Sequence, residues 1–154
     1  MKILILSDTH GEITAAERII RAEKPDQVIH LGDCMRDAED LDRIFPYLPI
    51  CKVPGNNDWF SDTPKEKTVS FGDTHVFLCH GHTTGVKSGL HLQISRTLQT
   101  GATVSLFGHT HRPLLEEDGG ILILNPGSLT YSHTYAILTL SPGSKPLGEI
   151  KEDR

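Results

Sequence analysis

The chain has 154 residues, of which 37% are hydrophobic and 23% are charged, and its formal net charge is −5. These values are typical of an ordinary globular protein, and we expect one domain over residues 1–154. The negative charge argues against general electrostatic attraction to nucleic acid, so no strong nucleic-acid binding is expected. No apolar stretch is long enough to predict a membrane span. Three widely spaced cysteines favour reduced thiols over a disulfide scaffold, which predicts a cytoplasmic protein.

The first third of the chain alternates predicted strands with predicted helices. Apolar runs of strand length occur three times, at residues 3–6, 27–31 and 48–53. Two stretches with apolar residues at helical spacing lie between them, at about 15–24 and 35–45. The first helix is expected to begin at a capping box formed by Thr14 and Glu17. Because strands and helices alternate, we expect right-handed crossovers and a parallel sheet.

Later segments add hairpins, which predict a mixed strand arrangement. Hairpin turns are expected at Gly72-Asp73 and at residues 118–120. The expected strands flank these turns or stand alone, at residues 68–71, 74–78, 103–107, 114–117, 121–124 and 135–140. The tail after Pro142 is expected to give either a short edge strand or nothing. Mixed parallel and hairpin strands predict an α/β fold of two packed sheets with helices outside.

Two further stretches lie between these strands. A third helix is predicted to place four apolar residues on one face and to end at Gly101; the four are Val86, Leu90, Ile94 and Leu98. The loop at 59–66 is longer than a simple connection requires. Its aromatic residues Trp59 and Phe60 could line a substrate crevice, form a subunit contact or make a plain surface cluster, and a homo-oligomer is left open.

Polar side chains follow five predicted strands at the point where each strand ends. The five junctions are Asp8-Thr9-His10, Gly32-Asp33, Gly55-Asn56, Cys79-His80-Gly81-His82 and Gly108-His109-Thr110-His111. Because the ends of strands in an open α/β sheet converge on one crevice, we expect these donors to lie close together. Carboxylate, carboxamide and imidazole donors suit manganese, with iron, nickel or zinc as alternatives. Seven donors suit two divalent ions that share a bridging carboxylate and lie about 3.5–4 Å apart.

Each donor also has a simpler structural explanation when it is taken alone. Asp8 and Asp33 could cap helices, and Asn56 could support a turn. The occurrence of all seven donors at strand ends favours the metal site over these separate explanations. The remaining histidines are expected to be structural; they are His30, His75, His91 and His133.

The order of these motifs resembles the calcineurin-like metallophosphoesterases, whose pattern is Asp-x-His, Gly-Asp, Gly-Asn-x-Asp, His and Gly-His-x-His. The resemblance runs from Ile3 to about Asn125 and looks strongest for the small YfcE-type phosphodiesterases, which the stretch at 125–128 (Asn-Pro-Gly-Ser) also fits. It implies a four-layer α/β/β/α sandwich of two mixed sheets. By the family pattern one ion would be held by Asp8, His10 and His111. The other would be held by Asn56, His80 and His109, with Asp33 bridging the two.

The resemblance implies hydrolysis of a small phosphodiester by attack of a hydroxide that bridges the two metal ions. Asn56 and Arg112 are the candidate substrate contacts. One departure concerns catalysis, because Asn57 stands where many family members have a histidine. A carboxamide is no general acid at neutral pH, so either His82 or Asp58 would replace it, or the enzyme would rely on leaving groups that depart without a proton. Of the two side chains His82 is favoured, because it neighbours His80 and can titrate near neutral pH.

Other functions of the same fold remain alternatives. A phosphomonoesterase or a nuclease would use the same metal site, although the short chain leaves little room for a domain that reads a polymer. A non-catalytic protein-interaction scaffold, resembling the retromer subunit of this fold, would be expected to lose metal ligands. No ligand of the family pattern is missing here, which favours the enzyme.

Overall fold

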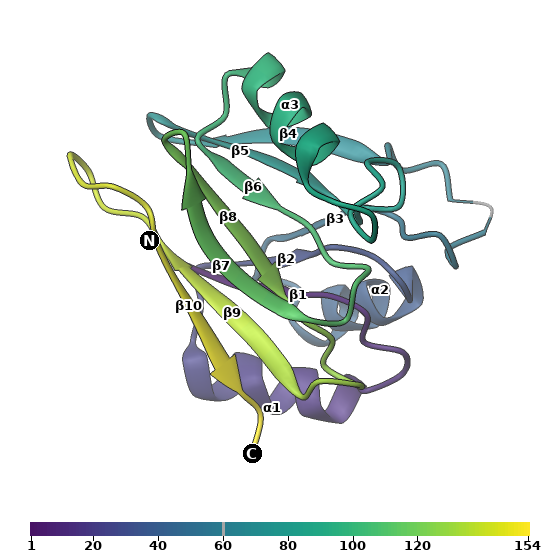
Figure 1. The fold of residues 1–154 in the computed structure, drawn as a ribbon. Coiled ribbons are helices and arrows are strands. Elements are labelled where there is room, and N and C mark those ends of the chain that lie inside the picture. Colours follow the sequence, from purple (N-terminus) through teal and green to yellow (C-terminus); the bar gives the residue numbers. More distant parts are fainter. Residues whose placement is uncertain (60) are drawn as a thin grey trace.

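The computed structural model describes residues 1–59 and 61–154 as two stacked β-sheets with helices on their outer faces (Figure 1). Its helices are α1 (Ile13–Glu23), α2 (Met35–Ile44) and α3 (His91–Thr100). Its strands are β1 (Lys2–Leu6), β2 (Gln27–His30), β3 (Ile50–Lys52), β4 (Glu66–Phe71), β5 (Thr74–Cys79), β6 (Val104–Leu106), β7 (Pro113–Asp118), β8 (Ile121–Pro126), β9 (Thr134–Thr139) and β10 (Leu147–Glu152). The expectation for Phe60 falls outside the described residues.

The first sheet has the strand order β10-β9-β1-β2-β3, with β1 at its centre. β1 pairs in parallel with β2 and antiparallel with β9, so Ile3 lies opposite both Gln27 and Leu138. Residues 3–6 are fully buried, which explains why this strand is apolar on both faces. The tail of the chain forms β10, the edge strand that the sequence left open.

The second sheet has the strand order β4-β5-β6-β8-β7. Its three inner strands run parallel to one another, and the outer strands β4 and β7 pair antiparallel with β5 and β8. Both predicted hairpins are therefore confirmed, with Gly72 in the first turn and Gly119 in the second at positive φ. The sheet is mixed, as expected from the alternation of hairpin and crossover signals.

Three apolar layers hold the sandwich together. The layer between the two sheets contains the fully buried Ile5, Ile29, Leu78 and Leu106. A second layer lies between the first sheet and helices α1 and α2, and a third lies between the second sheet and the segment that includes α3. The four-layer α/β/β/α sandwich is therefore confirmed. Within the described part of the chain, no helix has the length and apolar character needed to cross a bilayer.

The predicted capping box of the first helix is wrong. The helix begins at Ile13, so Thr14 already lies in its first turn, and Glu12 at the N-cap makes no side-chain hydrogen bond. The chain turns earlier because the backbone N–H of Glu12 donates to the carbonyl of Thr9 and that of Ile13 donates to Gly11. This tight entry brings the helix close behind the polar residues that follow β1.

The predicted apolar face of the third helix is confirmed in part. Val86 is buried, Leu90 and Ile94 pack against the same core, and the helix ends at Gly101 as expected. The expectation fails at Leu98, which is 58% exposed. Gln93 and Thr97 also face the sheet, because the strand beneath presents Ser105 to them. Gln93 Nε2 donates to Ser105 Oγ at 2.9 Å, and Thr97 Oγ1 donates to it at 2.8 Å. A paired polar seam therefore replaces the apolar contact at this position.

One carboxylate fastens α1 to three strands of the first sheet. Glu23 accepts hydrogen bonds from Tyr135 Oη at 2.7 Å and Lys151 Nζ at 2.6 Å, and it pairs with Lys2 Nζ at 2.7 Å. Burial alone would raise the pKa of Glu23, but the hydrogen bonds from these three side chains outweigh burial and lower the pKa to about 2. The charged carboxylate is thus the form that stabilises the fold.

We expect Glu23→Gln to lower the free energy of unfolding by about 1–3 kcal/mol near neutral pH, since it removes charged hydrogen bonds. Because the folded-state pKa is lowered, this stabilisation is fully present above the unfolded-state pKa of about 4.3 and is lost as the pH falls through the folded-state value. Urea unfolding of both proteins across this range measures the difference. A difference that stays constant down to low pH would contradict the assignment.

Candidate metal centre

The parallel strands of both sheets end at one edge of the sandwich, and the predicted donors lie in the loops that follow them. β1, β2 and β3 run in one direction, as do β5 and β6. Three of the donors are buried: Asp8 and His80 are 0% exposed, and Asp33 is 2% exposed. The sequence-based expectation that strand ends converge is therefore met by the buried donors of both sheets.

One group of possible metal ligands contains Asp8, His10 and His111, whose ligand atoms all lie within 4.8 Å of one another. His111 Nε2 is 3.1 Å from Asp8 Oδ1. Tyr131 stacks on the ring of His111 with 4.7 Å between centroids, and it meets His10 edge-on at 5.4 Å. This group is the more exposed part of the centre, because His10 is exposed and His111 is half-buried.

A second group contains Asp8, Asp33 and His80 within the same 4.8 Å limit, so the two groups share Asp8. His80 Nε2 is 3.8 Å from Asp8 Oδ1 and 3.6 Å from Asp33 Oδ2. His109 adjoins this group, with its Nδ1 3.2 Å from His80 Nε2. Two imidazole nitrogens at that separation need a proton or a cation between their lone pairs, which suits a metal site.

The donor set fits divalent cations on grounds of charge. Asp8 and Asp33 are buried carboxylates, yet in the described residues neither pairs with a lysine or an arginine. Two buried negative charges side by side require compensation, which a bound cation supplies. His80 is also oriented for ligation, because its Nδ1 donates to the carbonyl of Leu31 at 2.7 Å and leaves the Nε2 lone pair facing the carboxylates.

Five of the donors occupy left-handed backbone conformations that are unusual for side chains other than glycine. They are Asp8 (φ 51°), His10 (φ 40°), Asp33 (φ 54°), His109 (φ 68°) and His111 (φ 60°). Such conformations cost free energy and persist only where surrounding contacts enforce them. Their concentration at this edge of the sandwich marks it as a functional site.

Two glycines allow the loops to approach the carboxylates. A Cβ atom on Gly55 would lie 2.0 Å from Asp33 Oδ1, and one on Gly108 would lie 2.1 Å from Ser7 Oγ and 2.9 Å from Asp8 Oδ2. All of these distances are too short for a Cβ atom, so neither position accepts a residue other than glycine without a shift of its neighbours. The glycines that precede the predicted donors are therefore required by close packing at this centre.

The structure gives Asn57 and Asp58 supporting contacts. Asn57 donates to Asp33 through its backbone N–H at 3.0 Å and through Nδ2 at 2.8 Å. Asp58 accepts four backbone N–H bonds at 2.7–3.1 Å, from Asp33, Cys34, Met35 and Gly55. Each oxygen of the Asp58 carboxylate therefore accepts two of these bonds, and the carboxylate ties the loop after β3 to the beginning of α2. The expectation that Asp58 donates a proton to the substrate stays a prediction.

The remaining predicted residues lie around the buried group. Asn56 is exposed, and none of the hydrogen bonds in the described part of the chain involves its side chain. His82 lies beside two candidate ligands, with its ring centroid 5.6 Å from that of His80 and 6.3 Å from that of His109. Its buried Nδ1 has no hydrogen-bond partner among the described residues. Arg112 is exposed and lines a separate cavity.

Burial and neighbouring positive charge favour the neutral form of two site histidines, His82 and His109. Burial, with His80 and Lys87 nearby, lowers the pKa of His109 to about 4. The pKa of His82 is also lowered by burial, followed by His80 and Lys65. Neutral imidazole is the form that ligates metal ions.

The loop after β8 supports the centre in a way that the sequence analysis missed. Ser128 Oγ donates to the carbonyl of Asp8 at 2.8 Å, and Thr130 Oγ1 donates to that of Thr9 at 2.6 Å. Asn125 Nδ2 donates to the carbonyl of Gly108 at 3.0 Å. The Asn-Pro-Gly-Ser stretch was noticed only as a family feature, because nothing in its spacing indicates which loops it contacts.

A buried polar chain behind the first loop was also missed. The histidine expected to be structural, His30, is fully buried, and its Nε2 lies 2.9 Å from Thr9 Oγ1. Thr9 Oγ1 in turn donates to Asp37 Oδ2 at 2.6 Å, and the N–H of Gly11 donates to the same oxygen at 2.7 Å. Asp37 lies on α2, so this chain of bonds fixes the loop that carries Asp8. The bonds form only because α2 presents Asp37 on the side that faces this loop.

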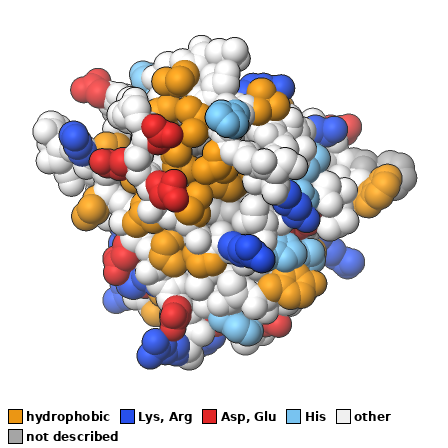
Figure 2. All heavy atoms as spheres, viewed as in Figure 1, with side chains coloured by type: hydrophobic (Ala, Val, Ile, Leu, Met, Phe, Trp, Pro, Cys, Tyr) orange, Lys and Arg blue, Asp and Glu red, His pale blue; other side chains and the backbone are white. Residues whose placement is uncertain are grey.

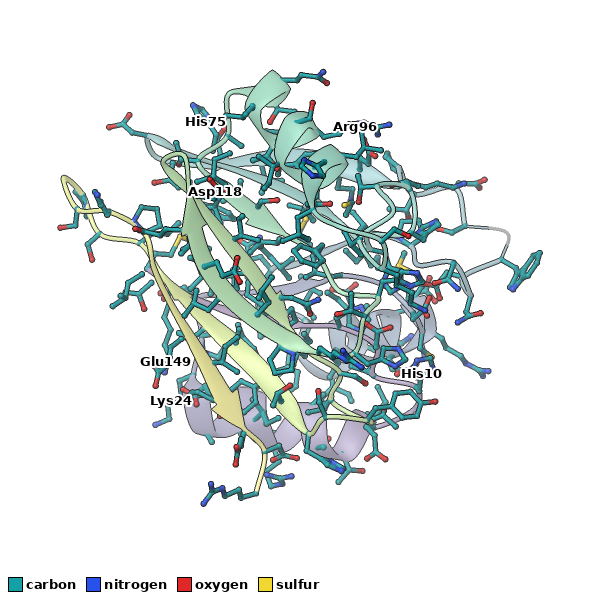
Figure 3. All side chains as sticks on the ribbon, viewed as in Figure 1. His10, Lys24, His75, Arg96, Asp118 and Glu149 are labelled. Carbon is teal, nitrogen blue, oxygen red and sulfur yellow. The ribbon has the colours of Figure 1, made fainter. Side chains whose placement is uncertain are left out.

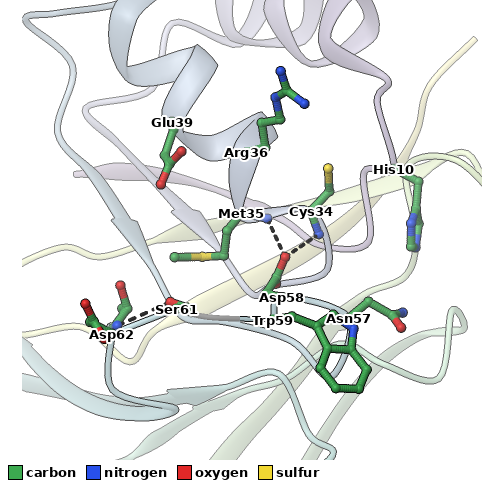
Figure 4. Close-up of a pocket in the computed structure, with 11 residues that line it drawn as sticks. His10, Cys34, Met35, Arg36, Glu39, Asn57, Asp58, Trp59, Ser61 and Asp62 are labelled. Carbon is green, nitrogen blue, oxygen red and sulfur yellow. Dashed lines mark hydrogen bonds between the residues drawn. The ribbon is translucent and has the colours of Figure 1, made fainter.

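A cavity of about 670 Å³ opens beside the centre, and Figure 4 shows its walls. His10 and Asn57 border it from the metal side, while Arg36 and Glu39 extend into it from α2. Trp59 lines the cavity and is 78% exposed, which agrees with the expectation that it could border a substrate crevice. The cavity offers room for an ester group next to the candidate ligands.

The structure thus combines a four-layer sandwich with clustered carboxylates and imidazoles at its strand ends, which form a candidate metal site. The chain matches the family model described as the calcineurin-like phosphoesterase superfamily domain over residues 1–143. It therefore belongs to the calcineurin-like phosphoesterase superfamily, as the motif order indicated.

Similar proteins carry phosphoesterase names. The chain is 34% identical over 148 residues to the probable metallophosphoesterase YsnB of Bacillus subtilis, covering 91% of this chain and 85% of that protein. It is 28% identical over 154 residues to the phosphodiesterase YfcE of Escherichia coli, covering 84% and 80%. These similarities agree with the YfcE-type resemblance of the motifs.

Solved structures share the fold. A crystal structure of an uncharacterised Streptococcus pneumoniae protein, described as a predicted phosphoesterase, has a TM-score of 0.77 at 26% identity and covers 96% of this chain and 97% of that one. The structure of Entamoeba histolytica Vps29 complexed with zinc has a TM-score of 0.76 at 20% identity and covers both chains completely. The second similarity shows the common fold alone.

We expect Gly55→Ala to weaken binding of divalent cations by about 10- to 100-fold, because a methyl group at this position displaces Asp33. Calorimetric titration with Mn²⁺ measures the affinity, and circular dichroism checks that the variant is folded. Gly148→Ala on β10 is the matched control, since its Cβ would crowd only the flexible end of Leu115. Equal affinity of Gly55→Ala and the native protein would contradict the assigned contact.

Proposed function

We propose that this protein is a metal-dependent phosphodiesterase with a binuclear centre. The observation that carries the proposal is the shared position of Asp8 in two groups of candidate ligands, with the second buried carboxylate Asp33 alongside. Family membership and the phosphodiesterase name of the YfcE relative support the reaction class. The substrate would be a small phosphodiester, since a metal centre recognises the phosphoryl group and the cavity beside it has limited volume.

The ligands of the proposed centre follow the family pattern. One ion would be held by Asp8, His10 and His111, and the other by the side chains of Asn56, His80 and His109, with Asp33 between them. Divalent ions held by these residues would activate water as the nucleophile and would offset the charge that develops on the phosphoryl oxygens. Oxygen and nitrogen donors without thiolate favour Mn²⁺, with iron, nickel or zinc as alternatives.

The protein's own contribution is to hold these donors in place before the substrate arrives. Asn57 fixes Asp33 by two hydrogen bonds, and Ser7 Oγ donates to Asp8 Oδ2 at 2.5 Å. Hydrolysis adds the water oxygen to phosphorus, breaks the bond to the ester oxygen and transfers a proton to the leaving alcohol. We assign that proton transfer to His82, because its Nδ1 has no partner in the described residues and it adjoins His80 and His109. Since burial lowers the pKa of His82, this role uses the minor, protonated form of the imidazole near neutral pH.

The environment in which the protein works is inferred from its thiols. Cys34, Cys51 and Cys79 are all free. Free thiols that are buried or half-buried suit a reducing compartment, which supports a cytoplasmic location.

The second candidate function is a protein-interaction scaffold. The shared fold of Vps29 motivates this alternative. Against it stands the presence of every donor of the family pattern, together with the strained backbone that holds several of them. Stoichiometric binding of a protein partner without metal uptake would favour the scaffold over the hydrolase.

We expect Asp33→Asn and His80→Ala each to lower the rate of bis(p-nitrophenyl) phosphate hydrolysis with Mn²⁺ by at least about 100-fold, since each weakens charge compensation at the phosphoryl group. Release of p-nitrophenolate measures the rate. His75→Ala is the matched control, because His75 is exposed and lies far from His10 across the molecule (Figure 3). Unchanged turnover in the two site variants would remove the proposal.

We expect the effect of His82→Gln to grow as the leaving group becomes more basic. A p-nitrophenolate departs without a proton, whereas an alkoxide needs one, so loss of the acid should cost about 10²–10⁴-fold for alkyl esters and much less for p-nitrophenyl esters. Rates for a series of substituted aryl and alkyl methyl phosphates give the dependence on leaving-group pKa. A uniform loss across the series would assign His82 a binding or structural role.

A further inference from the structure

A second cavity adjoins the candidate metal centre, with a volume of about 650 Å³. We call it the basic groove, and it is lined by Val86, Lys87, Leu90, Phe107, Thr110, Arg112, Pro113, Leu114 and Asn125. It shares no lining residue with the cavity of Trp59 and Arg36. A phosphodiester carries two ester groups, and two separate cavities beside one centre can accommodate one group each.

The groove is built on the loop that carries the candidate ligands. Thr110 lies between His109 and His111 in the sequence, and its hydroxyl accepts a hydrogen bond from Asn125 Nδ2 at 3.0 Å. Asn125 also anchors the carbonyl of Gly108, so one buried side chain fixes both the groove wall and the ligand loop. The groove wall and the loop that carries His109 and His111 are therefore held together as one unit.

The charge of the groove differs from that of the protein as a whole. The chain has 20 acidic and 15 basic residues, yet no acidic residue lines the groove. Lys87 and Arg112 are exposed, and neither forms an ion pair with another described residue. Figure 2 shows basic side chains next to histidines on this face. Two unpaired positive charges make the groove complementary to an anion.

The floor of the groove is apolar and preformed. Phe107 and Val86 are buried in the same core layer, with Leu90 and Leu114 packed against it. The other cavity has a different character, since Glu39 and Asp62 line it together with Arg36. An apolar floor with two cations at the rim suits a flat ring that bears a negative charge.

We propose that the basic groove selects phosphodiesters in which one ester group combines an apolar ring with a second phosphate, as in a nucleotide that carries a further phosphate. This inference rests on the proposed phosphodiesterase activity. Leu90 and Leu114, which are half-buried and rest on the buried Phe107 and Val86, form the surface for the ring, and Lys87 and Arg112 contact the second phosphate. The groove thus determines specificity, while the metal centre performs the reaction.

The test compares two chromogenic diesters in the Mn²⁺-loaded protein, the p-nitrophenyl ester of thymidine 5′-phosphate and the same compound with a 3′-phosphate. We expect kcat/KM to be about 5- to 20-fold higher for the 3′-phosphorylated compound, as expected for two partly exposed ion pairs. Replacement of the nucleoside by a two-carbon chain that bears the phosphate should reduce kcat/KM, because the ring contact is lost. Equal values for all three compounds would overturn the proposal.

Charge reversal identifies the residues responsible. Lys87→Glu and Arg112→Glu should each lower the ratio of kcat/KM for the two thymidine esters, and the double variant should bring it to one or below. Lys145→Glu is the control of equal charge change, because Lys145 lines a different cavity with Thr103 and Glu117, at the opposite end of β6 from His109. If Lys145→Glu lowers this ratio equally, the preference for the 3′-phosphate comes from net charge, and the proposed role of the groove is wrong.

The two proposals fail in different ways. If the esters are hydrolysed without a preference for the 3′-phosphate, the groove inference is wrong and the phosphodiesterase stands. If neither ester is hydrolysed, the proposed function fails, and the groove is tested by calorimetric binding of thymidine 3′,5′-bisphosphate to the native protein and Lys87→Glu. Equal affinity of the two proteins would then overturn the groove as well.

Discussion

Among the described residues, two carboxylates are buried without a lysine or arginine partner, and this is the constraint on which the rest of the structure depends. Asp8 and Asp33 lie at the ends of adjacent parallel strands and are surrounded by imidazoles and backbone N–H groups. Such an arrangement does not by itself stabilise the folded state, because each buried charge loses its hydration and must be compensated. The loops, glycines and supporting side chains around these residues are understandable as the means of keeping that charge in one place.

The fold and the donor positions could be predicted because both depend on local patterns. Apolar runs that end in Asp, Asn or His identify strand ends, and parallel strands bring such ends together whatever the details of packing. The supporting contacts of Ser128 and Asp37 could not be predicted, since they join segments that are remote in the sequence and have no periodic pattern. Side-chain hydrogen bonds between distant loops become visible only once the loops are placed.

The errors have equally specific causes. The apolar face of the third helix was predicted correctly up to Ile94 but not at Leu98, because the strand beneath presents Ser105, which pairs with Gln93 and Thr97. The capping box of the first helix failed because the loop after β1 turns tightly to hold its own polar residues, and the helix begins earlier. In both cases a tertiary contact outweighed a local preference of the chain.

The candidate ligands come from both sheets, with Asp8 and Asp33 following strands of the first and His80 and His109 following strands of the second. A cation held among them would strengthen the connection between the two halves of the sandwich at this end, where hydrogen bonds from His80 to the carbonyl of Leu31 and from the His109 N–H to Asp8 already join them. A bound ion would therefore cross-link the two sheets in addition to its role in hydrolysis. The melting temperature of the protein would then rise with the free concentration of the ion. Chelation would loosen this end of the molecule first and leave the opposite end, with its hairpin turns, to unfold later.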